Sequence, residues 1–159
     1  MSRFVIYINL PKYLSQFIVS HLGSPVAFPP SSNENAIIRA FIRRLPQGAV
    51  PETVSEGATP VVIPDSVAKP PEFFNYMGSR GKRAVAEAIK DIFLRSLWSD
   101  ISPLNRSSVG LNSLISAWCE SHGIELDQVE TVRQCYYRMR KDYAASGINI
   151  KKSSQKNHL

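Results

Sequence analysis

Hydrophobic residues recur along the first part of the chain in patterns that predict strands and helices. The β-branched and aromatic run 3–9 favours a strand. Residues 11–22 repeat apolar side chains at helical spacing, with Pro11 in the first turn, where its missing N–H costs nothing. A second apolar stripe predicts a helix over 33–45, and 26–28 is a short strand candidate before it.

The pattern changes over residues 46–78, which hold six of the eleven prolines. One strand candidate, 61–63, interrupts this stretch, and aromatic residues are concentrated in 73–77. This composition predicts a linker or an extended segment that wraps around its neighbours. The aromatic run indicates docking onto a neighbouring core.

Helical periodicity returns at residue 79 in three successive stripes. The first is broken by Pro103, the second ends at Gly123, and the third runs from Asp127 to Gly147, which is expected to end it. These patterns predict the fold class α+β, mostly α. The expected parts are an N-terminal α/β segment (1–45), a Pro-rich linker (46–78), a basic three-helix unit (79–145) and a disordered basic tail (146–159).

Composition and charge narrow the range of partners. The 159 residues are 43% hydrophobic and 20% charged, which is ordinary for a globular protein. The net charge of +6 favours polyanions such as DNA, RNA or acidic lipid. No stretch approaches the roughly 18–20 apolar residues that span a bilayer, and no signal-peptide cleavage site follows the N-terminal apolar run. We therefore expect a cytoplasmic protein with no membrane partner, whose two cysteines are buried, reduced thiols.

Segment 113–141 resembles the helix-turn-helix of DNA-binding proteins, in which a helix ends at a glycine and a second helix packs across it. Gly123 occupies the turn position, where a left-handed residue is needed. The apolar side chains that this crossing would bury are Trp118, Cys119, Ile124, Val129 and Val132. A generic helical hairpin satisfies the same pattern and remains an alternative.

The resemblance implies that the helix from Asp127 enters the major groove of duplex DNA, N-terminal residues first. Arginine can then address guanine and glutamine adenine, while basic side chains reach phosphates. The implied contacts are Gln128, Thr131, Gln134 and Arg138, with Arg133, Arg140 and Lys141 nearer the backbone. The acids Glu125, Asp127 and Glu130 depart from this pattern, because phosphates would repel them, and they shift the expected contact towards 138–141. The alternative is that they cap the helix and favour its dipole.

A second basic element, residues 79–83, precedes the first helix of the three-helix unit. Arg80, Lys82 and Arg83 are candidates for gripping backbone phosphates. A solvated helix N-terminus is the alternative interpretation, since cations there oppose the helix dipole.

The N-terminal order of strand, Leu-Pro, helix, glycine and helix is also similar to the ribbon-helix-helix family. That resemblance implies a homodimer whose paired strands read DNA through outward side chains, here Val5, Tyr7 and Asn9. The segment 23–32 between the helices is longer than the family allows. The alternative is a plain α/β layer that docks on the helical unit or dimerises.

Catalytic and metal-binding patterns are weak in this sequence. His21 and His122 lie at apolar helix faces, and His158 lies in the tail. Cys119, His122 and Cys135 have a spacing typical of metal ligands, but no fourth ligand is evident. Gly-rich phosphate loops and nucleophile motifs do not occur. We expect no enzyme activity, no cofactor and no metal.

These observations favour a non-enzymatic protein that binds duplex DNA, with a role in transcription regulation or as a replication accessory factor of a mobile element. The alternative is a protein-interaction or oligomerisation module with no nucleic-acid role. The two differ in salt dependence, because a protein that neutralises several phosphates loses affinity steeply as salt rises.

Overall fold

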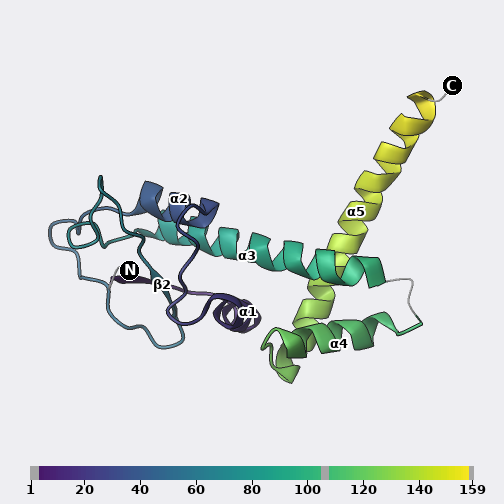
Figure 1. The fold of residues 1–159 in the computed structure, drawn as a ribbon, viewed down its shortest axis with the longest axis horizontal. Coiled ribbons are helices and arrows are strands. Elements are labelled where there is room, and N and C mark those ends of the chain that lie inside the picture. The colour runs from purple at the N-terminus through teal and green to yellow at the C-terminus, as the bar shows by residue number, and fades with distance from the viewer. Residues whose placement is uncertain (1–3, 105–107, 158–159) are drawn as a thin grey trace. The chain divides into compact units, whose positions relative to one another are not determined.

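The computed structural model describes the backbone of residues 4–104 and 108–157, and the side chains of those residues up to Ser146. It confirms an α+β fold that is mostly helical (Figure 1). The chain forms two compact units, Met1–Phe93 (unit 1) and Leu94–Leu159 (unit 2).

Unit 1 contains a small antiparallel sheet. β1 (Val5–Ile8) pairs with β2 (Thr59–Val62). Val26 adds a single parallel bridge to Val61 on the other edge of β2. Both predicted strands are therefore confirmed within the described residues, although residue 3 lies outside them, and the third strand candidate is reduced to one bridge. The partner of β1 is a strand of the same chain, which differs from the dimeric ribbon implied by the ribbon-helix-helix resemblance.

Segment 46–78 is part of unit 1 instead of a separator between units. It supplies β2, and Met77 near its end is 1% exposed. The Lys69 ammonium donates hydrogen bonds of 2.8 and 2.9 Å to the backbone oxygens of Arg39 and Ile42. Of the two alternatives, a linker or a wrapping segment, the structure shows the wrapping segment. Residues 46–78 return to β1 and supply the strand that pairs with it. The boundary between the two units falls after Phe93, within a helix. The sequence predicted this boundary after residue 78.

The core of unit 1 includes side chains from its first helix, α1 (Lys12–Leu22). Phe17 is fully buried, and its ring meets the ring of Phe93 edge-on at 5.3 Å between centroids. Tyr13 lies 5.1 Å from the same ring. Gly23 ends α1 with a φ of 86°, a conformation that side chains disfavour, as the sequence predicted.

The second helix, α2 (Asn33–Phe41), begins at Ser32, whose hydroxyl accepts a hydrogen bond from the backbone of Asn35. Its predicted end at residue 45 is wrong. The chain leaves the helix at residue 42, because the backbone of Arg43 makes two hydrogen bonds, of 2.9 and 3.0 Å, with that of Tyr76. Sequence periodicity could not reveal this competing partner.

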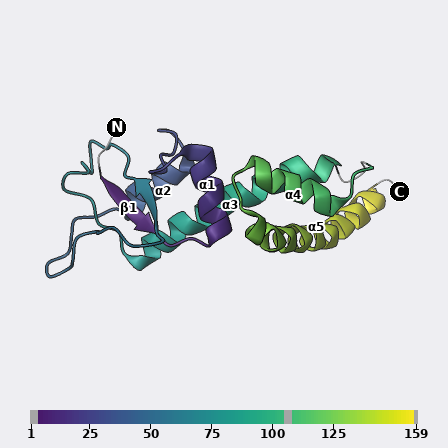
Figure 2. The ribbon, with the colours of Figure 1, turned by 90° about the horizontal axis from the view of Figure 1, so that it is seen from below.

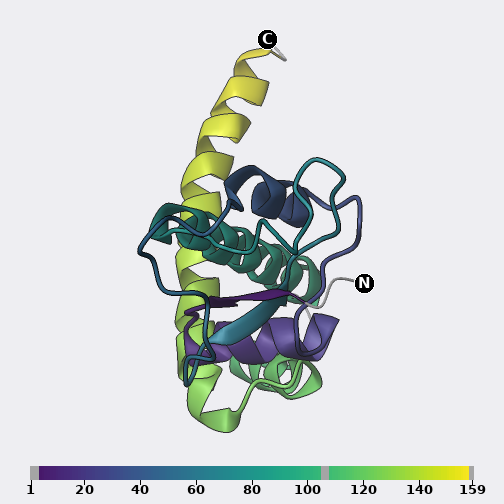
Figure 3. The ribbon, with the colours of Figure 1, turned by 90° about the vertical axis from the view of Figure 1, so that its left-hand side faces the viewer.

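The long helix α3 (Ser79–Ile101) begins against α2 (Figure 3). At Gly81 the two helices approach so closely that a Cβ would lie 2.7 Å from the Cβ of Phe41. Val85, Ile89 and Phe93 then follow as the buried stripe that the sequence predicted. A 3-10 turn, Ser102–Leu104, follows α3.

Unit 2 combines the end of α3 with α4 (Leu111–Ser121), a 3-10 turn (Leu126–Gln128) and α5 (Val129–Asn157) (Figure 2). The three predicted helices are confirmed. The predicted end of the last helix at Gly147 is wrong, because α5 continues to Asn157; residues 158–159 lie outside the described ones. Glycine ends a helix where it turns left-handed; elsewhere it costs only about 1 kcal/mol relative to alanine, and the Lys, Ser and Gln that follow tolerate a helix. Among the described helices, none is long and apolar enough to cross a membrane.

Candidate nucleic-acid interface

The turn between α4 and α5 has the geometry that the sequence predicted. Gly123 has a φ of 71°. The backbone N–H of Ile124 donates to the carbonyl of Cys119 at 2.9 Å, and that of Gly123 donates to Glu120 at 3.3 Å. This pair of hydrogen bonds defines a Schellman motif, which satisfies the last carbonyls of α4 and redirects the chain.

The predicted core of this helical pair is buried. Its members are Trp118, Cys119, Ile124, Val129 and Val132, all at most 7% exposed. The indole N–H of Trp118 donates to a carboxylate oxygen of Asp100 on α3 at 2.9 Å. The ring of His122 lies 4.2 Å from that indole and 3.7 Å from the same carboxylate oxygen. His122 is thus held by packing contacts, and this packing suits both a helix-turn-helix and a helical hairpin.

Three aromatic rings fix α5 against the end of α3. Trp98 stacks on Tyr136 at 5.5 Å and on Tyr143 at 4.3 Å between ring centroids. Tyr136 is fully buried. Because this stack fixes the apolar face of α5, the opposite face of the helix points to solvent.

The first turns of α5 carry the candidates for base contacts. Thr131 and Gln134 are exposed, and Gln128 is half-buried. The Arg133 guanidinium forms an ion pair with the Glu130 carboxylate three residues earlier, so it is already engaged. Thr131 and Gln134 are thus accessible, but the charge of Arg133, the cation among these candidates, is neutralised by Glu130.

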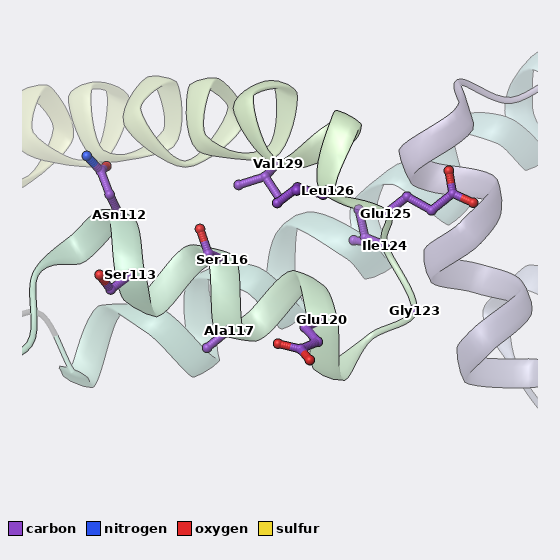
Figure 4. Close-up of a pocket in the computed structure, with 10 residues that line it drawn as sticks. All are labelled: Asn112, Ser113, Ser116, Ala117, Glu120, Gly123, Ile124, Glu125, Leu126 and Val129. Carbon is purple, nitrogen blue, oxygen red and sulfur yellow. The ribbon is translucent and has the colours of Figure 1, made fainter.

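Acidic residues dominate the approach to these turns. A groove of about 670 Å³ lies between α4 and the start of α5 (Figure 4). It is lined by Asn112, Ser113, Ser116, Ala117, Glu120, Gly123, Ile124, Glu125, Leu126 and Val129. Two of these ten residues are acidic and none is basic, while Asp127 and Glu130 beside them are exposed. A phosphate backbone would meet repulsion at this end of α5.

The central part of α5 has the opposite character. Arg138, Arg140 and Lys141 are exposed, and in the part of the chain that the structure describes none of them is in an ion pair. The Arg140 guanidinium lies 4.9 Å from the ring centroid of Tyr137, whose hydroxyl donates to the side-chain oxygen of Asn112 at 2.9 Å. These three cations are available to an external anion.

The helical extension adds basic residues that sequence reasoning placed in a disordered tail. Lys151, Lys152 and Lys156 belong to α5. Over its whole length α5 contains seven lysines and arginines and two acidic residues, an excess of five positive charges. The absence of any strong helix breaker after Gly147 was the signal that could have revealed this continuation.

The basic element at the start of α3 belongs to unit 1, whereas the α5 cations belong to unit 2. Lys82 forms an ion pair with Glu52, with 2.8 Å between the ammonium nitrogen and the carboxylate oxygen. Arg80 and Arg83 are exposed, and no ion pair engages them among the described residues. Three of the ten candidate residues therefore lie in unit 1 and seven in unit 2.

Other candidate chemistry finds no support in the described residues. No group of three or more His, Cys, Asp or Glu in that part of the chain could hold a metal ion. His21 stacks on the ring of Phe17 at 5.8 Å. Cys119 and Cys135 are free thiols, and Cys119 is buried.

The thiol of Cys119 predicts a pH dependence of stability. Burial raises the pKa of this thiol from 9.0 to about 11, and the Arg133 guanidinium offsets part of that rise. Because the thiol ionises earlier in the unfolded chain, stability is present below pH 9 and is lost between pH 9 and 11. Urea unfolding at pH 7.5 and 10.5 should show wild type losing about 2 kcal/mol more than Cys119→Ala. Cys135→Ala is the control, and an equal loss in wild type and Cys119→Ala would contradict the prediction.

Comparison with known proteins places the chain in no family: no protein-family model, no curated protein and no solved structure matches it.

Proposed function

We propose that this chain is a non-enzymatic DNA-binding protein that contacts the phosphates of duplex DNA with the basic face of α5. The observation that carries the proposal is the charge of that helix. Its residues 129–157 hold seven lysines and arginines against two acids, an excess of five positive charges, and Arg138, Arg140 and Lys141 are exposed without ion pairs among the described residues. Exposed cations along one rigid element can neutralise successive phosphates and release their counterions.

Contact through the middle of α5 fits this charge distribution better than insertion of its first turn. Glu125, Asp127 and Glu130 surround that first turn and are exposed. Cations that touch phosphates position a protein on DNA without reading its sequence. We therefore expect most of the affinity to come from contacts with the phosphates of the DNA backbone, and we expect this affinity to depend strongly on salt. A role in transcription or in replication of a mobile element would build on this contact.

The test is a gel shift with random duplex DNA, comparing wild type with the variant Arg138→Ala/Arg140→Ala/Lys141→Ala. Loss of three phosphate contacts should weaken binding by about 100-fold at 0.1 M salt and flatten the slope of log K against log salt by about 2 to 3. The three side chains are exposed, so circular dichroism should show an unchanged fold. Absence of a wild-type shift at micromolar protein and low salt would overturn the proposal.

A second variant separates the two ways in which α5 could meet DNA. Glu125→Gln/Asp127→Asn/Glu130→Gln removes the acids at the start of the helix. If the middle of α5 makes the contact, this variant should change affinity only a few-fold and show no new sequence preference. A strong gain in affinity together with a sequence preference would show that the first turn enters the groove, and would refute the backbone-contact proposal.

The α4–α5 groove favours a protein-interaction module as the second candidate function. Leu126 in its lining is 85% exposed, and the two acids of the lining suit a basic, apolar segment of a partner. This candidate predicts no DNA shift by the wild-type protein, so the same experiment separates the two.

A further inference from the structure

Unit 1 carries a group of stacked arginines and aromatic rings that the α5 proposal does not use. The Arg44 guanidinium lies 4.8 Å from the ring centroid of Phe74 and 5.7 Å from that of Phe73. The Arg43 guanidinium lies 5.2 Å from the centroid of Tyr76. We name these five residues the arginine–aromatic cluster.

The backbone of unit 1 builds this cluster from two segments that are distant in the sequence. The hydrogen-bonded bridge between Arg43 and Tyr76 joins the end of α2 to the segment before α3. A Cβ at Gly78 would lie 3.0 Å from a guanidinium nitrogen of Arg43, so this side chain lies flat against the backbone there. The close approach at Gly81 holds α2 and α3 together beside it (Figures 1 and 3).

The cluster is strongly cationic and accessible. Arg43 and Arg44 are exposed, as are Arg80 and Arg83 in the first turns of the adjoining α3. Among the residues that the structure describes, no carboxylate forms an ion pair with any of these four arginines. The nearby acid Glu52 is engaged by Lys82 instead.

The aromatic part of the cluster is also open to solvent, because the ring of Phe73 is 59% exposed. Packing in the core therefore does not explain why a phenylalanine occupies this position. An arginine stacked on a ring keeps its N–H edges available for phosphate oxygens. The cluster therefore offers hydrogen-bond donors for phosphate oxygens next to a ring on which a flat group can stack.

We propose that the arginine–aromatic cluster binds single-stranded nucleic acid, with a base stacked on Phe73 and the adjoining phosphates on Arg43 and Arg44. Grooves that combine positive charge with exposed aromatic rings bind single strands in this way, since every unpaired base offers a π-face. Duplex DNA keeps its bases stacked internally and cannot use the ring. An acidic peptide would satisfy the arginines but would leave the ring unused.

The test measures binding of a fluorescent oligo(dT) of 12 nucleotides by anisotropy in the full-length chain. Phe73→Ala should weaken binding about 10-fold, because it removes one stacking contact but no charge. Arg43→Ala/Arg44→Ala should weaken it more than 10-fold. Lys90→Ala is the matched control, because Lys90 is an exposed cation of α3 outside the cluster, and it should change binding less than 2-fold.

Polyglutamate serves as the probe for an acidic protein partner. Phe73→Ala should leave its binding unchanged, because the polymer offers no base to stack. The proposal is overturned if polyglutamate binds as tightly as oligo(dT), or if the arginine variant behaves like Lys90→Ala. Arg44→Lys keeps the charge but removes the planar guanidinium, so it should lose affinity for oligo(dT). Its retained binding of polyglutamate would show that the loss does not come from misfolding.

This inference does not depend on the proposal for α5. The variant Arg138→Ala/Arg140→Ala/Lys141→Ala should lose duplex binding and keep the effect of Phe73→Ala on oligo(dT). Conversely, Phe73→Ala should leave duplex binding unchanged. Failure of either proposal is thus visible while the other stands.

Discussion

Replacing Phe93 with alanine is expected to lower the free energy of unfolding of unit 1 by about 3–5 kcal/mol. The Phe93 ring is fully buried, and it packs on Phe17 and Tyr13 of α1 at 5.3 and 5.1 Å between centroids. Truncation removes these contacts and leaves a cavity that two rigid helices cannot close. Because small domains are stable by only about 5–15 kcal/mol, this loss should approach global unfolding of the unit.

Hydrogen exchange of the α1 amides is the suitable measurement, because both tryptophans, Trp98 and Trp118, lie in unit 2 and do not report on unit 1. Phe93→Leu keeps most of the volume and should cost no more than about 1.5 kcal/mol. Phe73→Ala removes a ring that is 59% exposed and should stay within about 0.5 kcal/mol of wild type. A cost below about 1 kcal/mol for Phe93→Ala would contradict the packing of α1 on α3.

Gly81→Val is expected to destabilise unit 1 by about 2–3 kcal/mol and to weaken oligo(dT) binding. An added Cβ would lie 2.6 Å from the Cγ of Met77 and 2.7 Å from the Cβ of Phe41. The Met77 side chain can move aside, but the Phe41 Cβ is bound to the backbone of α2. The two helices must therefore separate, and the small gain in helix propensity over glycine does not offset that strain.

The matched control is Gly110→Ala, at the start of α4. Among the described residues, no atom apart from the adjoining backbone lies within 4 Å of a Cβ built there, and its φ of −62° suits any residue. This variant should cost no more than about 1 kcal/mol. Equal urea midpoints for Gly81→Val and Gly110→Ala would show that the approach of α2 to α3 is not tight.

Much of the fold follows from local patterns in the sequence. The β-branched and aromatic run 3–9 predicted β1, and helical periodicity predicted all five helices, because each signal lies within a short window of the chain. The turn at Gly123 was predictable for the same reason, since a left-handed residue after an apolar stripe ends a helix locally. The five core residues around that turn followed from their spacing.

Two of the wrong predictions, the end of α2 and the linker over 46–78, arose where a distant partner competed with local preference. The end of α2 depends on Tyr76, more than thirty residues after it, which captures the backbone of Arg43. The pairing of β1 with β2 crosses about fifty residues, and it converts an expected linker into part of a core. Neither contact leaves a periodic signal in the sequence.

The candidate sites divide in the same way. The sequence identified the basic residues of α5 and of the start of α3, but not which of them are free. Ion pairs engage Arg133 with Glu130 and Lys82 with Glu52. The second of these pairs joins residues thirty positions apart, so only the folded chain reveals it. The arginine–aromatic cluster likewise requires the bridge between Arg43 and Tyr76.

By itself, then, the sequence determined the helices, the strands, the left-handed turn at Gly123 and the overall basic charge. These depend on backbone propensity and on side-chain spacing within a few residues. The tertiary structure alone decided where the two units divide, which cations remain unpaired, and which rings lie beneath arginines. Apart from the local pair of Arg133 with Glu130, those properties depend on contacts between distant segments, and such contacts exist only after the chain has folded.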